Sequence, residues 1–545
     1  MKILVRNVMK NACQRAIHLT PVDIKFKRAF FGGAALTLGV WGCVPTTELV
    51  TDNLGPVPAY QTDNPFLANS PYPTIHGDGR VSDYIEDKAP TRIQEAWTVL
   101  PNEVFVQPCS SGENGQIYCT MARGGESGTC NLVALDLVTG EELWRDVDPV
   151  TQQCILDEGS TLNNPYIDKT GFLYTADTQK IVSFDADGKV RWVNDYPSTI
   201  VSAKGYPNVP FGLNALPSGE LVTATVGDGI VIVVDRNTGK TLATLDLPSE
   251  KTDTSGPVPE GYLVTKADDL AAELWWKVGL GDSGYEIDNN TAVDPQTGTI
   301  LISGGAPVGD SEHQGALWGL KYEAGRLRVL FHVPMAGEGG IATSPAISKD
   351  GNYVLIGNDA EQLVAVDLPT CLTLASRAMN PGPAGVVCEN YGTSDPVGFV
   401  IASSPTVAPD NRVYISLGMD GLGSFQIKGG NGSPVHVEKV WAAKLAQGRV
   451  PVSVITGFDN AIYFSDRNLR DSTHAVVAVD PSDGSILSTT PVGDAMNITM
   501  GVDPNTNERI LIANLGNLSD EQLTHKYGTP LLDRPAGVTT FKASR

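Results

Sequence analysis

Short apolar runs alternate with polar turns over most of the chain, and one unit of this pattern recurs. Its clearest copy is NLVALDLVTGEELWRD at 131–146, where an alternating strand is followed by a turn with Thr139 and Gly140 and by a second strand that carries Trp144. A period of two with glycine-containing turns predicts a β-hairpin. Further copies share the apolar strand, an aspartate and the turn; they begin at Ile181, Val231, Leu363 and Ala475.

A second motif precedes these hairpins. It consists of a short polar or proline-containing strand, a turn and an apolar strand that ends in Gly or Asp, as in NNPYIDKTGFLYTAD at 163–177. The two motifs together give four strands per repeat, and repeats of roughly 45–55 residues with four strands predict the blades of a β-propeller. The pattern gives eight units, beginning near Val104, Asn163, Gly212, Asn289, Ala342, Ser403, Val452 and Asn497.

The last unit ends at AGVTTFKA (536–543) without a fourth strand. We expect RIQEAWTVLP (92–101), which resembles an outer strand with its tryptophan, to supply it. Such a closure joins the ends of the domain and removes a free sheet edge. We therefore predict an all-β fold: an eight-bladed propeller of four-stranded blades over 91–545, with an insertion at 248–287.

The shared residues of the repeats have structural explanations. Trp144, Trp192 and Trp441 stand where an aromatic ring can pack between adjacent blades. The Asp-x-x-Thr-Gly turns carry side chains that bond local backbone amides and glycines that tolerate a positive φ. We therefore predict that these residues hold the fold and perform no chemistry.

Charge limits the classes of function. Only 19% of the residues are charged, the formal net charge is −23, and the basic residues are scattered. Binding to nucleic acid is not expected, because a protein that neutralises phosphates needs clustered Lys and Arg. An acidic surface keeps an exported protein soluble and leaves a cationic partner open.

The N-terminus predicts export. Basic residues precede an apolar run at 29–42, which is too short to span a bilayer but suits the central region of a secretory signal. The run ends at Cys43 in a stretch that resembles the lipobox of bacterial lipoproteins. This resemblance implies that Cys43 is lipidated and, because Val44 is not Asp, that the protein reaches the outer membrane. An ordinary signal peptide or a retained anchor is the alternative for 1–43.

Residues 44–90 are rich in Pro, Thr, Asn and Asp, which predicts an extended tether between lipid and domain. Six further cysteines agree with export, since an even count with close pairs predicts three disulfides in an oxidising compartment. Six cysteines allow 15 connectivities, and we expect nearest neighbours to pair. No CxxC or CxxCH motif offers a zinc, redox or haem site. The six are Cys109, Cys119, Cys130, Cys154, Cys371 and Cys388.

The pattern A-L-D-x-x-T-G-x-x-x-W, intact at Ala134 to Trp144, resembles the repeat of pyrroloquinoline-quinone (PQQ) propellers. PTIHGDGRVSDY at 73–84 resembles the stretch that commonly precedes the first blade in that family. The resemblance implies the architecture but no activity. The same blades serve quinone-dependent dehydrogenases and non-enzymatic scaffolds, such as the propeller subunit of the outer-membrane β-barrel assembly machine.

The resemblance also implies what a dehydrogenase would require. Those enzymes bind the quinone over the central channel, often between a disulfide of adjacent cysteines and a Trp, with calcium held by a carboxylate and an Asn and with an Asp as base. This chain has no adjacent cysteines. GNGSPV at 430–435 is similar to the calcium-binding motif but ends in Val and is expected in a hairpin away from the channel, and DADG at 185–188 lacks the other ligands of a calcium loop.

Four residues are candidates for binding a ligand or partner. His76 and His313 are the histidines best placed to line a site, although each also suits a surface or a turn position. Trp275 and Trp276 lie in a helix-like stretch of the insertion, where one ring can pack down while the other meets a partner. The alternative is that both rings cap the propeller.

We therefore predict a lipid-anchored scaffold on the periplasmic or cell-surface side of the bacterial outer membrane. It would bind an envelope protein or an extracellular ligand, with no catalytic residues, metal or cofactor. The alternative is a PQQ- and calcium-dependent dehydrogenase of alcohols or related substrates.

Overall fold

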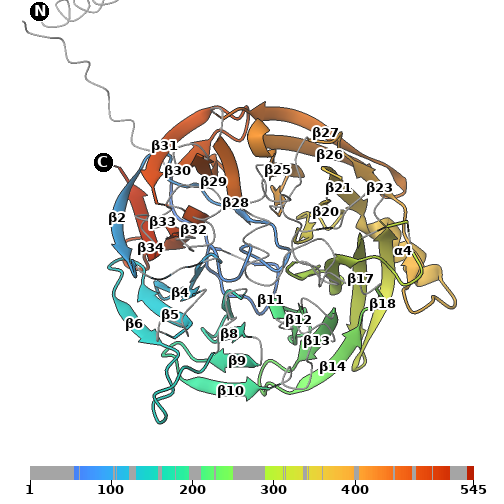
Figure 1. Ribbon diagram of the computed structural model, residues 1–545, viewed down its shortest axis with the longest axis horizontal. Coiled ribbons are helices and arrows are strands. Elements are labelled where there is room, and N and C mark those ends of the chain that lie inside the picture. Colours follow the sequence, from blue (N-terminus) through green and yellow to red (C-terminus); the bar gives the residue numbers. More distant parts are fainter. Residues whose placement is uncertain are drawn as a thin grey trace, which may run out of the picture. The chain divides into compact units, whose positions relative to one another are not determined.

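The repeats fold into antiparallel sheets arranged as a ring (Figure 1). The computed structural model describes residues 54–544 apart from short gaps and seven longer ones, at 122–129, 157–162, 196–209, 250–288, 335–340, 398–403 and 516–536. The described residues form eight blades, which confirms the predicted propeller. The lipobox with Cys43 and the insertion with Trp275 and Trp276 lie outside them.

The first four blades follow the predicted repeats, each running from the channel outward. Blade 1 consists of β3 (Ser110–Ser111), β4 (Gln116–Thr120), β5 (Leu132–Asp136) and β6 (Glu142–Arg145); blade 2 of β7 (Tyr166–Ile167), β8 (Leu173–Ala176), β9 (Ile181–Phe184) and β10 (Val190–Asn194); blade 3 of β11 (Pro210–Ala215), β12 (Leu221–Thr225), β13 (Ile230–Val234) and β14 (Thr241–Asp246); and blade 4 of β15 (Ala292–Val293), β16 (Thr299–Gly305), β17 (Gly315–Glu323) and β18 (Arg326–Pro334).

The remaining blades complete the ring. Blade 5 consists of β19 (Ala346–Ile347), β20 (Tyr353–Gly357), β21 (Leu363–Asp367) and β23 (Tyr391–Thr393); blade 6 of β24 (Thr406–Val407), β25 (Arg412–Ser416), β26 (Leu422–Gly430) and β27 (Ser433–Ala443), with the 3-10 helix η5 (Gly418–Asp420); blade 7 of β28 (Arg449–Phe458), β29 (Ala461–Asn468), β30 (His474–Val479) and β31 (Ile486–Val492); and blade 8 of β32 (Ala495–Val502), β33 (Arg509–Leu515), β34 (Gly537–Ala543) and β2 (Ile93–Val99).

Strand β2 closes the ring as predicted. It pairs antiparallel with β34, with Gln94 opposite Lys542 and Val99 opposite Val538. The N-terminal side of the domain thus supplies the outer strand of the last blade. The closure leaves blade 8 with four strands and covers the outer edge of β34.

The core lies between neighbouring blades. A typical middle strand, β5, is buried at all its apolar positions, whereas the outer strand β6 is largely exposed. Its Trp144 packs on the next blade: the indole Nε1 donates to Ala186 O at 2.9 Å, and a Cβ on Gly188 would lie 2.5 Å from the ring. This confirms the predicted packing between blades. The same bond joins Trp97 to Leu137 O, Trp192 to Arg236 O and Trp441 to Pro481 O.

Blade 5 departs from the predicted strand and turn at 363–375. Strand β21 is followed by helix α4 (Leu368–Arg377), and Asp367 caps this helix by accepting from Thr370 N at 3.1 Å. Pro369 stands where the other repeats begin a glycine-containing turn, and proline favours the first turn of a helix. The excursion then adds β22 (Val386–Val387), which pairs with β18 in parallel at the edge of blade 4.

The disulfides join nearest neighbours, as expected. Cys109 pairs with Cys119 across β3 and β4, Cys130 with Cys154, and Cys371 with Cys388, with Cα–Cα distances of 4.4, 5.1 and 5.4 Å. The third disulfide ties α4 to the chain that follows β22.

The prediction of an extended tether is wrong for residues 64–90, here called the channel segment. This segment lies in the centre of the ring (Figure 1), and Leu67, Tyr72 and Ala89 have no exposed surface. The composition predicted a tether because the segment has no long apolar run. Its backbone is instead bonded to the free edges of the inner strands. The donors and acceptors are Ser111 N to Tyr72 O, Ile167 N to Pro73 O, Val293 N to Gly79 O, Ile347 N to Arg80 O, Val407 N to Ser82 O and Gly457 N to Asp83 O, at 2.7–2.9 Å.

Candidate functional site

His76 lies in a turn of the channel segment and is only 4% exposed, so a surface position is excluded while the turn position is confirmed. Its Nδ1 is 2.7 Å from Asp83 Oδ2, and the hydroxyl of Tyr72 donates to Asp83 Oδ1 at 3.3 Å. Burial raises the pKa of Asp83, and the hydrogen bond from His76 opposes that shift. The carboxylate therefore orients the imidazole, with the Nδ1 proton directed at Asp83.

The other ring nitrogen faces the start of the inner strands of blades 4 and 5. Nε2 of His76 lies 3.0 Å from Asn290 Nδ2 and 3.1 Å from Ser344 Oγ. Ser344, His76 and Asp83 thus have the connectivity of a Ser-His-Asp triad. Triads are recognised by geometry and role, so the role of the hydroxyl has to be decided from its surroundings.

Those surroundings do not favour a nucleophile. The hydroxyl of Ser344 has a closer acceptor, Asn289 Oδ1 at 2.8 Å, and the amide of Asn290 already donates toward His76 Nε2. Ser344 has no exposed surface, so a substrate cannot reach its oxygen in this arrangement. The network fixes the channel segment against blades 4 and 5.

The backbone around His76 is unusual. His76, Val81 and Asp83 have φ values of 60°, 62° and 51°. Non-glycine residues rarely adopt this left-handed region, and a β-branched residue such as Val81 is disfavoured there. The bonds to the inner strands hold these conformations and aim both His76 and Asp83 into one network.

A cavity of about 380 Å³ lies between the chain at 58–86 and the turns after the inner strands of blades 4 and 5. Arg80 lines it and is 9% exposed; its Nη1 donates to Asp63, and its Nη2 is 3.5 Å from Asp78 Oδ2. Burial alone would lower the pKa of Arg80, but the two carboxylates raise it above its ordinary value. Lys349 and Glu86 form an exposed ion pair at the same cavity.

The sequence did not single out the cavity residues. Arg80 and Asp78 belong to the 73–84 stretch, whose resemblance to the family's leading segment was the available signal. Glu86 reaches the same cavity through the path of the channel segment across the ring, and Asp63 directly precedes that segment. The sequence pattern does not encode this path.

The other histidine candidate is separate from His76. Nδ1 of His313 lies 2.8 Å from Asp310 Oδ2 in the connection between β16 and β17, and both side chains are partly exposed. This local pair lowers the pKa of Asp310 even though burial acts in the opposite direction. The structure therefore does not bring the two predicted histidines into one site.

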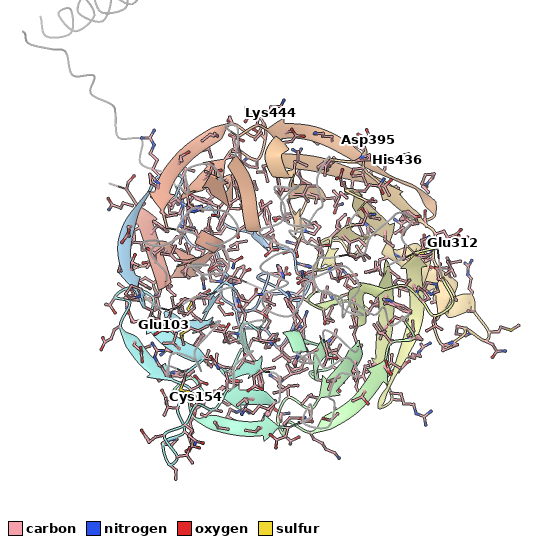
Figure 2. The ribbon with its side chains drawn as sticks, viewed as in Figure 1. Glu103, Cys154, Glu312, Asp395, His436 and Lys444 are labelled. Atoms are coloured by element: carbon pink, nitrogen blue, oxygen red, sulfur yellow. A yellow bond between two sulfur atoms is a disulfide. The ribbon has the colours of Figure 1, made fainter. Side chains whose placement is uncertain are left out.

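The stretches that resemble calcium motifs are turns. Residues 430–435 form the tip of the β26–β27 hairpin as predicted, with Asn431 and Gly432 in the turn at φ values of 54° and 85°. His436, in the outer strand β27, marks the position of this hairpin at the rim of the ring (Figure 2). DADG at 185–188 forms the turn between β9 and β10.

The described residues do not match the quinone and calcium site that the resemblance implies. Among the described residues, no three His, Cys, Asp or Glu side chains cluster in a way that would hold a metal ion. Cys109 and Cys119 are ten positions apart and pack in the core between blades 8 and 1. We derive no chemical step through a quinone.

The fold and channel define an eight-bladed β-propeller. Comparison of the sequence with models of known protein families gives its family. A family model described as PQQ_2, outer membrane protein assembly factor BamB, matches residues 129–490, more than half of the chain. The chain belongs to this family.

Two solved structures are reported among those similar to this chain. The quinohemoprotein alcohol dehydrogenase ADHIIG from Pseudomonas putida HK5 is similar with a TM-score of 0.53 and 13% identity, over 89% of this chain and 81% of that one. BamB from Moraxella catarrhalis has a TM-score of 0.44 and 14% identity, over 83% and 100%. Likeness at this identity concerns the architecture alone. No curated protein matches the chain by sequence, and no helix among the described residues is long and apolar enough to cross a membrane.

Proposed function

We propose that this protein is an exported, lipid-anchored scaffold of the bacterial envelope that binds another envelope protein or an extracellular ligand through its outer surfaces. The observation that carries this proposal is the filled channel. Six inner strands are bonded to the channel segment, so the axis of the ring is occupied by the chain itself. A partner would therefore contact the faces or the rim of the propeller.

Three of the exposed apolar side chains among the described residues are more exposed than the others. Val150, Val308 and Met379 are 87%, 69% and 95% exposed. They lie after β6, after β16 and beyond α4, on separate parts of the ring. Exposed apolar side chains are common singly, so their use has to be tested one position at a time.

Photo-crosslinking in the intact cell tests the scaffold. A photoreactive residue is placed at Val150, Val308 or Met379 of the full chain, and at the fully buried Leu355 as a control. We expect a discrete heavier species from at least one surface position and none from Leu355. Absence of any such species, together with dye-linked alcohol oxidation after reconstitution with PQQ and calcium, would reverse the proposal.

The anchor is tested separately through Cys43. Cys43→Ala should release the protein into the soluble fraction, while Cys13→Ala, which leaves the lipobox intact, should not. Membrane retention of the Cys43→Ala protein would contradict the anchor and leave the crosslinking result unaffected.

A further inference from the structure

The two ends of the propeller carry different connections. Consecutive strands of a blade are antiparallel, so the turns after the first and the third strand lie at the same end of the sheet. We call this end the entry face; it includes the turn at 348–352 between β19 and β20 and the turn at 185–188 between β9 and β10. The other end, the far face, carries the connections between second and third strands and those between successive blades.

The chain that leads into the ring lies at the entry face. Lys169, in the first turn of blade 2, donates through its backbone N–H to Phe66 O at 3.0 Å. The guanidinium of Arg236, in the last turn of blade 3, stands over the ring of Phe66, 4.4 Å from its centroid. The cavity described above is lined by Pro58 and by Lys349, which lies in the first turn of blade 5. Each of these contacts involves a turn at the same end of the sheets, so the chain approaches the ring from the entry face.

Arg509 fixes the position of the chain before it reaches the channel. Its Nη1 and Nη2 donate to Gly55 O at 3.1 Å and to Pro56 O at 3.0 Å. Arg509 is 5% exposed and follows the first turn of blade 8, and its ion pair with Asp87 holds the guanidinium in place. The hydroxyl of Tyr60 donates to the same carboxylate at 2.5 Å. The chain is therefore held against the entry face from Gly55 onward.

The sequence limits how far Gly55 can lie from the proposed lipid on Cys43. Eleven residues, 44–54, separate the two positions, and a fully extended chain of this length spans at most about 40 Å. Arg509 begins the second strand of blade 8, so two further strands, about 4.8 Å apart, lie between Gly55 and the rim. Strand β33 has 7 residues, which makes the blade roughly 23 Å tall. A path from Gly55 over the rim to the far face therefore requires about 35 Å, nearly the whole reach.

We propose that the entry face is the membrane-facing side of this protein and that its neighbour there is the lipid headgroup surface. This inference rests on the lipid anchor of the proposed function and assigns the two faces of the scaffold. In this orientation the chain at 44–54 spans only the gap between lipid and protein. The reverse orientation would force that chain to be almost straight, which costs conformational entropy. The net charge of −23 opposes adsorption to anionic lipid, so the orientation comes from the reach of the chain.

The far face is then turned away from the membrane and is free for a protein partner. Val150, 87% exposed, lies in the connection between blades 1 and 2. Val308, 69% exposed, lies in the connection between the second and third strands of blade 4. Both therefore belong to the far face, whereas Met379 lies on the α4 excursion at the rim. The proposed orientation presents the first two side chains to a partner on the side away from the lipid.

Energy transfer to labelled lipids measures which face lies nearer the membrane. The full lipidated chain carries one fluorophore and is anchored to phosphatidylcholine vesicles with acceptor dyes on the headgroups. The fluorophore is attached at the exposed Gln296, in the first turn of blade 4, or at Val308 at the other end of the same blade. A second matched pair is the exposed Asp187, in the last turn of blade 2, and Val150. We expect at least about twofold stronger transfer from the entry face than from the far face, because the ends of a blade lie roughly 20 Å apart.

Two controls separate the orientation from the anchor. Cys43→Ala should give no transfer from any position. Insertion of about 40 Gly and Ser residues within 44–53 adds a coil of roughly 35 Å and should make transfer from the two faces equal. Failure of the unaltered chain to attach to the vesicles would contradict the lipid anchor and, with it, the orientation. Attachment with equal or stronger transfer from the far face would overturn the orientation alone, and so would a difference between the faces that survives the longer linker.

Discussion

The outer hairpins and the channel segment are held by different kinds of contact. In a hairpin such as β5–β6 the bonds are local: Asp136 Oδ1 accepts from Val138 N at 3.0 Å and from Thr139 N at 2.8 Å. In the channel segment they are remote, since His76 contacts Asn290, 214 positions away. Local repeats specify the blades, whereas long-range polar contacts specify the centre of the ring. Changes in the two regions should therefore have unequal effects.

The largest effect is expected from Asp87→Ala. Asp87 forms a two-pronged ion pair with Arg509 at 2.6 and 2.7 Å, and both side chains are 4% exposed. Removing one partner leaves a buried charge uncompensated, so the free energy of unfolding should fall by about 3–5 kcal/mol. Urea unfolding of the full chain measures this change. A loss below about 1 kcal/mol would show that the channel segment is not a structural part of the ring.

Gly188→Ala should have the next largest effect. A Cβ at this position would lie 2.5–3.0 Å from three atoms of the Trp144 ring, and Gly188 has a φ of 81°. We expect a loss of about 2–3 kcal/mol from the clash and the strained backbone. Gly171→Ala is the control, because its φ is 80° but its Cβ would meet nothing within 4 Å. Equal losses from the two variants would remove the role assigned to the tryptophan.

The stability of the fold should depend on pH because of Asp146. Burial raises its pKa to about 7, although Leu132 N and Leu156 N donate to the carboxylate. The pKa of Asp146 is higher in the folded than in the unfolded protein, so the folded state binds its proton more tightly. The resulting contribution to the free energy of unfolding is complete below about pH 4 and is lost as the pH rises through 7.

Wild-type protein should therefore be more stable at pH 5 than at pH 8, with Asp146 contributing about 2.5 kcal/mol of that difference. Thermal melts of wild type and Asp146→Asn at both pH values measure the contribution. A difference of the same size in the variant would assign it to other groups.

The smallest effect is expected from Glu438→Gln. Its ion pair with Lys428 is more than half exposed at both ends. Exposed pairs contribute roughly 0–1 kcal/mol, and salt screens them. Urea unfolding at low and high salt should show a change within this range. A loss comparable to that of Asp87→Ala would show that contacts at the rim stabilise the fold as much as contacts in the centre.

The repeats predicted the blades because their signals are local. Asp136 with Thr139 and Gly140 sets the turn, Trp144 marks the outer strand, and the surplus strand at 92–101 fits the unit that lacks one. Helix α4 was not predicted, because the rest of this repeat is intact and only Pro369 stands where the other repeats begin their turn. The predicted hairpin formed in the repeats that keep the turn residues.

The channel site was less predictable. His76 was a candidate from sequence, but its partners Asp83, Asn290 and Ser344 come together through positive φ values and the path of the channel segment. Neither feature leaves a periodic signal. Polar composition predicted a tether at 44–90, whereas residues 64–90 are held in the centre of the ring by backbone bonds that any residue type can make.

Hydrogen exchange of the channel segment measures most directly whether this segment is a folded part of the ring. Mass spectrometry of peptides covering 72–87 in the folded full chain reports whether their amides are shielded. Our account predicts protection on the timescale of the middle strands, such as β5 and β12. Complete exchange within seconds, with those strands still protected, would mean that the segment lies outside the ring and that the channel is open.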